Sequence, residues 1–160
     1  MSELRGVLAM RLLLVSSSGG HLAQLLCLRS WWEKHERHWV TFDTEDAVAK
    51  LAGEDVTWAH HPTTRSLSNL LRNTVQARAV LHHYRPDLVV STGAAVAVPY
   101  FWLGHAHRHH PPNVYLEVYD RVETPTLTGR LCRPVTDLFL VQWPEQQHLY
   151  RSSVLVGELW

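Results

Sequence analysis

Short apolar runs alternate along the chain with stretches in which apolar residues recur at helical spacing. The apolar runs, typical of buried strands, cover residues 7–15, 38–42, 56–59, 87–93, 114–117, 137–141 and 154–156. The range 87–93 includes the turn that follows the run. The helical patterns cover residues 22–34, 44–51, 65–85, 94–103, 126–131 and 144–150. This alternation predicts βαβ units, and therefore a Rossmann-like, three-layer α/β domain with a mostly parallel sheet.

Length and composition limit the number of domains and the classes of partner. A chain of 160 residues, of which 46% are hydrophobic, can build one domain with a sizeable core, so we expect a single domain over residues 1–160. The formal net charge is zero and the arginines are scattered along the sequence, which gives no indication of a nucleic-acid partner. Cys27 and Cys132 lie far apart without a C-x-x-C motif, which favours reduced thiols.

The apolar run over residues 7–15 also indicates whether the chain has a membrane anchor or a signal peptide. Arg11 interrupts it, and its length is less than half of the roughly 20 residues that span a bilayer. A signal peptide needs a longer apolar stretch followed by a small-residue cleavage site. We therefore expect a cytoplasmic chain without a transmembrane anchor.

Two of the predicted strands end in turns of small residues. The first runs into Ser18, Gly19 and Gly20, and the strand that begins near residue 87 ends at Thr92 and Gly93. Glycines leave the N–H groups of the following helix uncovered, and these groups favour an anion. Because both turns follow parallel strands, we expect them to face one anion-binding crevice. Ordinary turn chemistry, which opens many α/β folds, is the alternative.

His21 stands at the start of the helix after the first turn. An imidazole there can exchange a proton with a phosphate or a sugar hydroxyl, which makes His21 a candidate general base. A helix-capping role is the alternative. The turn contains neither G-x-G-x-x-G nor G-K-[ST], so a nicotinamide or ATP enzyme is a weak interpretation and we predict no cofactor.

Charged and aromatic residues follow two later strands. We expect Glu117 to orient a sugar hydroxyl and Arg121 to hold a phosphate at the crevice rim, a surface salt bridge between them being the alternative. Gln142 and Trp143 at a strand end, and Trp160 in the apolar tail, are candidates for a partner interface. Burial in the core explains Trp143 equally well.

Four histidines at His105, His107, His109 and His110 raise the question of a metal site. No cysteine or carboxylate lies nearby in the sequence to complete one, so we predict no metal site. A solvated loop before Pro111 is the favoured interpretation.

Five segments together carry a resemblance to a known family. They are Ser-Ser-Gly-Gly-His over residues 17–21, residues 91–99, Glu117 with Arg121, residues 127–131 and residues 137–145. In this order they resemble the asparagine-linked-glycosylation-fourteen family and its bacterial counterparts in exopolysaccharide clusters. The resemblance extends over nearly the whole chain.

The resemblance implies the N-terminal, acceptor-side half of a GT-B glycosyltransferase. Such a chain would be one subunit of a two-part UDP-sugar transferase of the N-acetylglucosaminyltransferase kind. It would present a lipid-pyrophosphate-linked acceptor, and a separate donor-binding partner would bring the UDP-sugar. In this interpretation the catalytic residues are His21 and Glu117, and the acceptor is held by Ser18, Gly19, Gly20, Thr92, Gly93 and Arg121. A stand-alone nucleotide or nucleotide-sugar enzyme is the alternative function.

The resemblance also implies a place at the inner face of the plasma membrane. Many family members carry an N-terminal transmembrane segment, whereas here only a short stretch precedes the first strand. Peripheral contact would then come from the surface, for which the helix over residues 65–85 and the segment 100–103 are candidates. Core packing with a solvated polar face is the alternative for both.

Overall fold

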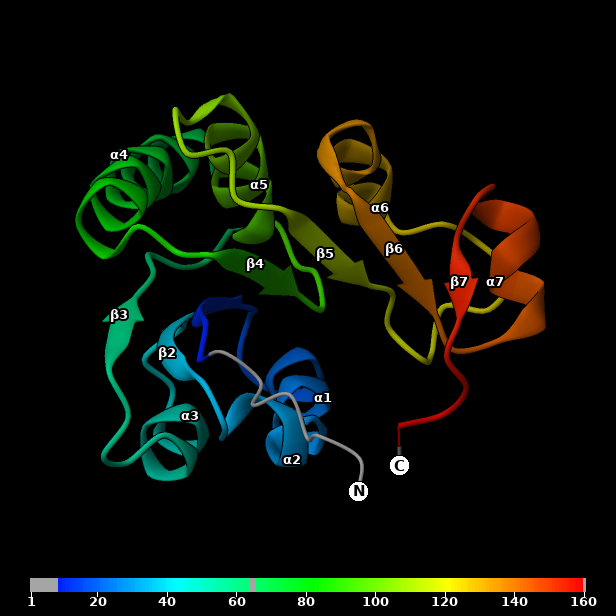
Figure 1. The fold of residues 1–160 in the computed structure, drawn as a ribbon, viewed down its shortest axis with the longest axis horizontal. Coiled ribbons are helices and arrows are strands. Elements are labelled where there is room, and N and C mark those ends of the chain that lie inside the picture. Colours follow the sequence, from blue (N-terminus) through cyan, green and yellow to red (C-terminus); the bar gives the residue numbers. More distant parts are fainter. Residues whose placement is uncertain (1–8, 64–65, 160) are drawn as a thin grey trace, which may run out of the picture.

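The computed structural model describes residues 9–63 and 66–159. Seven parallel strands form one sheet in the order β3-β2-β1-β4-β5-β6-β7 (Figure 1). The strands are β1 (Arg11–Val15), β2 (Glu36–Thr41), β3 (Val56–Trp58), β4 (Leu88–Ser91), β5 (Asn113–Leu116), β6 (Leu138–Val141) and β7 (Val154–Leu155). The helices are α1 (Gly20–Cys27), α2 (Arg29–Trp32), α3 (Glu45–Lys50), α4 (Leu67–Tyr84), α5 (Ala97–Ala106), α6 (Leu127–Cys132), the 3₁₀ turn η1 (Arg133–Val135) and α7 (Pro144–Leu149).

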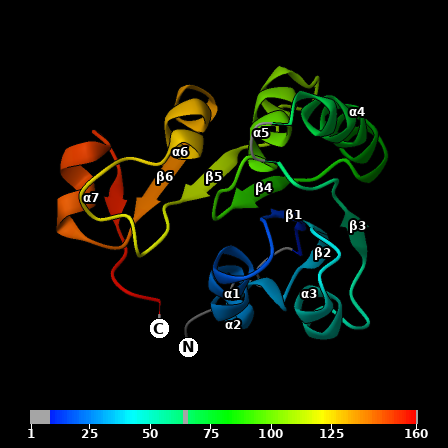
Figure 2. The same ribbon diagram turned by 180° about the vertical axis from the view of Figure 1, so that it is seen from behind.

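The helices lie on both faces of the sheet, which confirms the predicted Rossmann-like α/β fold. Helices α1, α2 and α3 cover one face, and α4, α5 and α6 cover the other (Figures 1 and 2). Side chains alternate across a strand, so Leu12 and Leu14 of β1 join one core cluster and Leu13 and Val15 join the other. The strand order reverses between β1 and β4, because the chain first builds outward from β1 to β3 and then from β4 to β7.

The predicted helix over residues 22–34 is divided in two. Helix α1 ends at Cys27, and Leu28 separates it from α2. The buried indole of Trp32 folds back and donates to the carbonyl of Leu25 at 2.8 Å, which also accepts from the N–H of Leu28 at 3.1 Å at the end of α1. The apolar spacing continues through this break, so the pattern alone does not reveal it.

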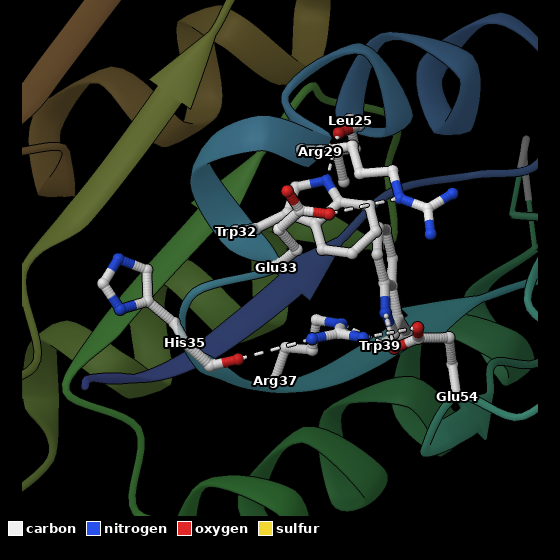
Figure 3. A network of polar contacts seen from close by, with 8 residues as sticks. All are labelled: Leu25, Arg29, Trp32, Glu33, His35, Arg37, Trp39 and Glu54. Carbon is white, nitrogen blue, oxygen red and sulfur yellow. Dashed lines mark hydrogen bonds and ion pairs between the residues drawn. The ribbon is translucent and has the colours of Figure 1, made fainter.

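A polar network holds α2 against β2 and the turn before β3 (Figure 3). Arg37 donates to both carboxylate oxygens of Glu54, each at 2.7 Å, and the indole of Trp39 donates to the same carboxylate at 3.1 Å. The guanidinium of Arg37 also lies over the ring of Trp32, 4.7 Å from its centroid. This network therefore connects three elements outside the region of the two glycine turns.

Some predicted features fall outside the described residues, namely Arg65, Trp160 and the beginning of the apolar run over residues 7–15. Within residues 9–63 and 66–159, none of the helices combines the length and the apolar character needed to cross a bilayer.

Candidate functional site

The carboxyl ends of β1 and β4 lie side by side where the strand order reverses, since Val15 pairs with Ser91. The turns that follow these two strands contain the residues predicted from the sequence to form an anion-binding crevice. In open α/β sheets, ligands bind at such a reversal point. The two turns therefore lie where a ligand of this fold would bind.

Two hydrogen bonds join the turns. The Nδ1 atom of His21 lies 2.7 Å from the carbonyl oxygen of Thr92, and the hydroxyl of Thr92 donates to the carbonyl oxygen of His21 at 2.7 Å. A carbonyl oxygen only accepts, so the hydrogen bond assigns the proton of the neutral imidazole to Nδ1. The Nε2 atom then carries the lone pair, which is the arrangement that a general base requires.

Gly93 allows this close approach. Its φ of +107° is rarely adopted by residues with a side chain. A Cβ atom on Gly93 would lie 2.7 Å from the hydroxyl of Tyr115 and 3.3 Å from Cε1 of His21. The next residue, Ala94, also has a positive φ, of 68°. The second turn is thus shaped by its backbone and leaves room for the imidazole.

The first turn is open. Gly19 has a φ of +73°, and no neighbouring heavy atom lies within 4 Å of the place where a Cβ would stand on Gly19 or Gly20. Helix α1 has no side-chain cap at its N-terminus. The first N–H groups of α1 therefore have no side-chain acceptor. Ser18, which precedes this helix by two residues, is half-buried.

A hollow of about 170 Å³ lies beside the turns. His21 and Arg121 both line it, so the structure brings together two residues that the sequence predicted separately. Asp120, Tyr115 and Thr126 line it as well. The guanidinium of Arg121 is exposed and has no carboxylate partner among the described residues, which leaves it available to an anion.

Glu117 lies inside the protein instead of at the crevice rim. Alternation along β5 directs it to the same face as Tyr115, where its side chain is fully buried. Its carboxylate accepts from the hydroxyl of Thr126 at 2.9 and 3.2 Å, from the N–H of Val118 at 3.0 Å and from the hydroxyl of Tyr150. Burial and this carboxylate raise the pKa of Tyr150 well above its ordinary value, so the phenol stays protonated and donates.

The alternative interpretation, a surface salt bridge between Glu117 and Arg121, is absent from the ion pairs of the described residues. Glu117 instead supports Thr126, which lines the hollow and caps α6 through the N–H of Gly129 at 2.9 Å. A Cβ on Gly129 would lie 2.7 Å from the Glu117 carboxylate. The pattern Thr-x-x-Gly at the start of the short helix, with Thr126 as its N-cap, is the sequence signal for this arrangement.

Two glutamines hold the loop that carries Arg121. Gln142, expected at a partner surface, is only 1% exposed and donates to the carbonyl of Glu117 at 2.9 Å. Gln146 donates to the carbonyls of Val118 and Arg121 at 2.8 and 3.1 Å. The indole of half-buried Trp143 donates to the carbonyl of Tyr119 at 2.7 Å. Gln142 and Gln146 thus position the crevice loop, and Trp143 remains partly accessible.

The histidine cluster forms local contacts at the end of α5 and in the loop that follows it. Nδ1 of His110 lies 2.5 Å from the carbonyl oxygen of His105, and the N–H of His109 donates to the ring of His107 at 3.3 Å. Throughout residues 9–63 and 66–159, no group of three or more histidine, cysteine or acidic side chains could hold a metal ion.

Comparison with known proteins places this site in a family context. Residues 57–159 match the model of the family described as "Oligosaccharide biosynthesis protein Alg14 like". The chain is 30% identical to the "UDP-N-acetylglucosamine transferase subunit ALG14" of Rattus norvegicus, over 92% of this chain and 82% of that protein. The human protein of the same name is 27% identical, over 94% of this chain and 83% of its own length.

Solved structures show the same fold at low sequence identity. MurG of Acinetobacter baumannii superposes with a TM-score of 0.74 at 15% identity, over 92% of this chain and 45% of MurG. The MnaA–UDP complex of S. aureus gives a TM-score of 0.71 at 14% identity, over 94% of this chain and 45% of MnaA. The chain therefore spans less than half the length of these structural relatives.

Proposed function

The chain belongs to the Alg14-like family of oligosaccharide biosynthesis proteins, and from this we propose that it is one subunit of a two-part UDP-sugar glycosyltransferase. In this proposal residues 1–160 form the acceptor-side domain, and a separate chain binds the donor UDP-sugar. The observation that carries it is the similarity, over 82% of its length, to a relative named as a transferase subunit.

The acceptor in this proposal is a sugar on a lipid pyrophosphate. Its phosphates would be held at the open N-terminus of α1, beside Gly19 and Gly20, and by the guanidinium of Arg121. The absence of a side-chain cap on α1 supports this assignment. So does the lack of an ion-pair partner for Arg121 among the described residues.

His21 would accept the proton of the attacking hydroxyl. The acceptor oxygen forms a bond to the anomeric carbon of the donor sugar, while the bond from that carbon to the phosphate oxygen of UDP breaks and UDP leaves with the electron pair. The proton of the acceptor hydroxyl passes to Nε2 of His21. The 2.7 Å contact of Nδ1 with the Thr92 carbonyl supports this role, because it keeps the basic nitrogen at Nε2.

Glu117 has a positioning role in this mechanism. Its carboxylate is buried and accepts hydrogen bonds from Thr126 and Tyr150, so it holds Thr126 at the hollow without reaching the reacting atoms.

The donor-binding partner would dock on the sheet face beyond α1. Leu138, Leu140 and Val154 share that face by strand alternation and by the pairing of Leu140 with Val154. Leu138 is 41% exposed and Val154 is 48% exposed, and none of the helices formed by the described residues covers this end of the face in Figures 1 and 2. An apolar sheet face of this kind is typical of an interface. Trp143 near the adjoining crevice loop would contribute a partly exposed ring.

Peripheral membrane contact at the inner face of the plasma membrane would involve α4. Leu67, Leu71 and Val75 lie on one side of this helix and are 78%, 68% and 72% exposed. Tyr100 and Phe101 of the second candidate segment are fully buried, and only Trp102 is exposed there. An apolar helix face of this kind supports interfacial binding.

Co-expression with a candidate donor-binding chain tests the proposal. We expect the purified pair to transfer sugar from UDP-N-acetylglucosamine to a lipid-pyrophosphate acceptor, and each chain alone to be inactive. Transfer or UDP-sugar hydrolysis by this chain alone would overturn it in favour of a stand-alone nucleotide-sugar enzyme.

A further inference from the structure

A groove of about 750 Å³ lies between α6, the turn η1 and the carboxyl end of α7. Its lining includes Arg130, Arg133, Arg151 and His148, together with Thr136. None of the residues that line it is acidic. Three guanidinium groups around one hollow create a positive potential that attracts an anion.

The arginines of this groove lack protein counter-charges. Among the described residues, the arginines that form ion pairs are Arg11, Arg29 and Arg37, all in the first part of the chain. Arg130 and Arg151 are exposed and form no side-chain hydrogen bond or ion pair within residues 9–63 and 66–159. The net charge of the whole chain is zero, so this groove is a local concentration of positive charge.

Arg133 is held in place by its neighbours. Its Nη2 atom donates to the carbonyl of Arg151, and its guanidinium lies over the ring of Phe139, 5.5 Å from the centroid. The planar guanidinium can still offer other N–H groups to a phosphate, which it matches in geometry. A pre-positioned arginine loses less side-chain freedom when it binds a ligand.

Apolar side chains stand at the same helix. Leu127 and Leu131 of α6 are 71% and 45% exposed, and Arg130 lies between them in the sequence. The indole of exposed Trp102 on α5 donates to the carbonyl of Leu131 at 3.0 Å, so this ring lies next to α6. Helices α5 and α6 are neighbours on one face of the sheet (Figure 1). A soluble phosphate needs no such apolar border, whereas a phospholipid presents phosphate and hydrocarbon together.

We propose that the groove between α6 and α7 binds the phosphate of an anionic phospholipid headgroup, while Leu127, Leu131 and Trp102 contact the hydrocarbon boundary. This inference rests on the peripheral membrane contact proposed above for α4. It adds a second contact at α6, which lies on the same face of the sheet as α4. In this proposal, contact with anionic lipid depends on the arginines of the groove as well as on the exposed apolar side chains.

Binding to lipid vesicles tests this site with the full chain alone. The probes are vesicles of phosphatidylcholine with and without phosphatidylglycerol, measured by co-sedimentation. The variant R130Q/R151Q removes two exposed charges and leaves the Arg151 carbonyl that Arg133 contacts. The control R29Q/K50Q removes two exposed charges from α2 and α3 on the opposite face. Near-ultraviolet circular dichroism checks that both variants fold.

We expect R130Q/R151Q to weaken binding to phosphatidylglycerol vesicles on the order of twenty-fivefold, or about fivefold for each charge. The control should change it by less than about threefold. Equal binding by R130Q/R151Q and the control would overturn the proposal. So would equal binding to pure phosphatidylcholine, or calorimetric binding of inorganic phosphate as strong as that of the vesicles, which would indicate a soluble anion. Since no sugar transfer is measured, these outcomes leave the transferase proposal to its own test.

Discussion

His21 and Thr92 are joined by two reciprocal hydrogen bonds of 2.7 Å, in which the side chain of each residue contacts the backbone carbonyl of the other. His21 lies in the first turn of α1 and Thr92 directly follows β4, so these bonds connect the two turns at the point where the strand order reverses. Each hydrogen bond ends on a backbone carbonyl, that of Thr92 or that of His21. The connection therefore depends on the backbone path of the two turns. Substitutions that move either turn should therefore alter the orientation of the imidazole.

Gly93→Ala tests this dependence. The new Cβ would stand 2.7 Å from the hydroxyl of Tyr115 and 3.3 Å from His21, at a φ that disfavours alanine. We expect a loss of about 1–3 kcal/mol in the free energy of unfolding, measured by urea denaturation. Gly20→Ala is the control, because no atom lies within 4 Å of its Cβ position and alanine favours a helix.

Adding Tyr115→Phe to Gly93→Ala should recover part of that loss, because it removes the hydroxyl that the new Cβ meets. If the double variant is as unstable as the sum of the two single variants, steric contact with Tyr115 is not the cause.

Glu117 variants separate positioning from catalysis. Glu117→Ala leaves the half-buried hydroxyl of Thr126 and the buried hydroxyl of Tyr150 without their acceptor, and we expect it to cost about 2–4 kcal/mol of stability. Glu117→Gln keeps an acceptor oxygen and the shape of the side chain. We expect the reconstituted pair with Glu117→Gln to transfer sugar within about tenfold of wild type, less than the hundredfold or more expected for loss of a catalytic carboxylate. A stable Glu117→Gln variant with a larger loss of rate would assign Glu117 to the chemistry.

The Arg37–Glu54 pair predicts a pH-dependent stability. Hydrogen bonds from Arg37 lower the pKa of Glu54 below its ordinary value, although partial burial opposes the shift. A folded-state pKa below the unfolded one stabilises the protein above the unfolded pKa, and this contribution is lost as pH falls through the folded value. We expect Glu54→Gln to lower the unfolding free energy at neutral pH by about 1 kcal/mol.

The difference between wild type and Glu54→Gln should shrink as pH falls below about 4, where the carboxyl group becomes protonated. Asp46→Asn, which breaks the exposed pair with Lys50, is the matched control and should have little effect at either pH. A Glu54→Gln effect that is constant between pH 7 and pH 3 would contradict this explanation.

The uncovered sheet face predicts where the partner binds. Val154→Lys places a charge on that face, and lysine is tolerated on an edge strand. We expect it to weaken binding of the donor-binding chain at least about tenfold, measured by calorimetry or pull-down with the purified partner. Val48→Lys on α3 is the control, since Val48 and Val154 are both 48% exposed. Equal effects of the two substitutions would show that the partner does not use this face.

Much of the fold follows from local pattern, because apolar runs and helical spacing mark the alternating elements of a parallel sheet. The meeting of the turns near Gly19 and Gly93 also follows, since adjacent parallel strands end at one edge. The inward direction of Glu117 does not, because a short apolar run does not reveal which face each side chain takes. The positioning role of Gln142 depends on carbonyls distant in sequence, such as that of Glu117 at 2.9 Å.

The central claim is that this chain supplies the proton acceptor for sugar transfer by a two-chain enzyme. His21→Asn tests it most directly, because an asparagine amide can still donate to the Thr92 carbonyl but has no equivalent of Nε2. The measurement is the rate of sugar transfer by the reconstituted pair, with the exposed-loop variant His109→Ala as control. We predict that His21→Asn binds its partner normally and transfers sugar roughly a hundredfold to ten-thousandfold more slowly. Transfer at the wild-type rate would contradict the account.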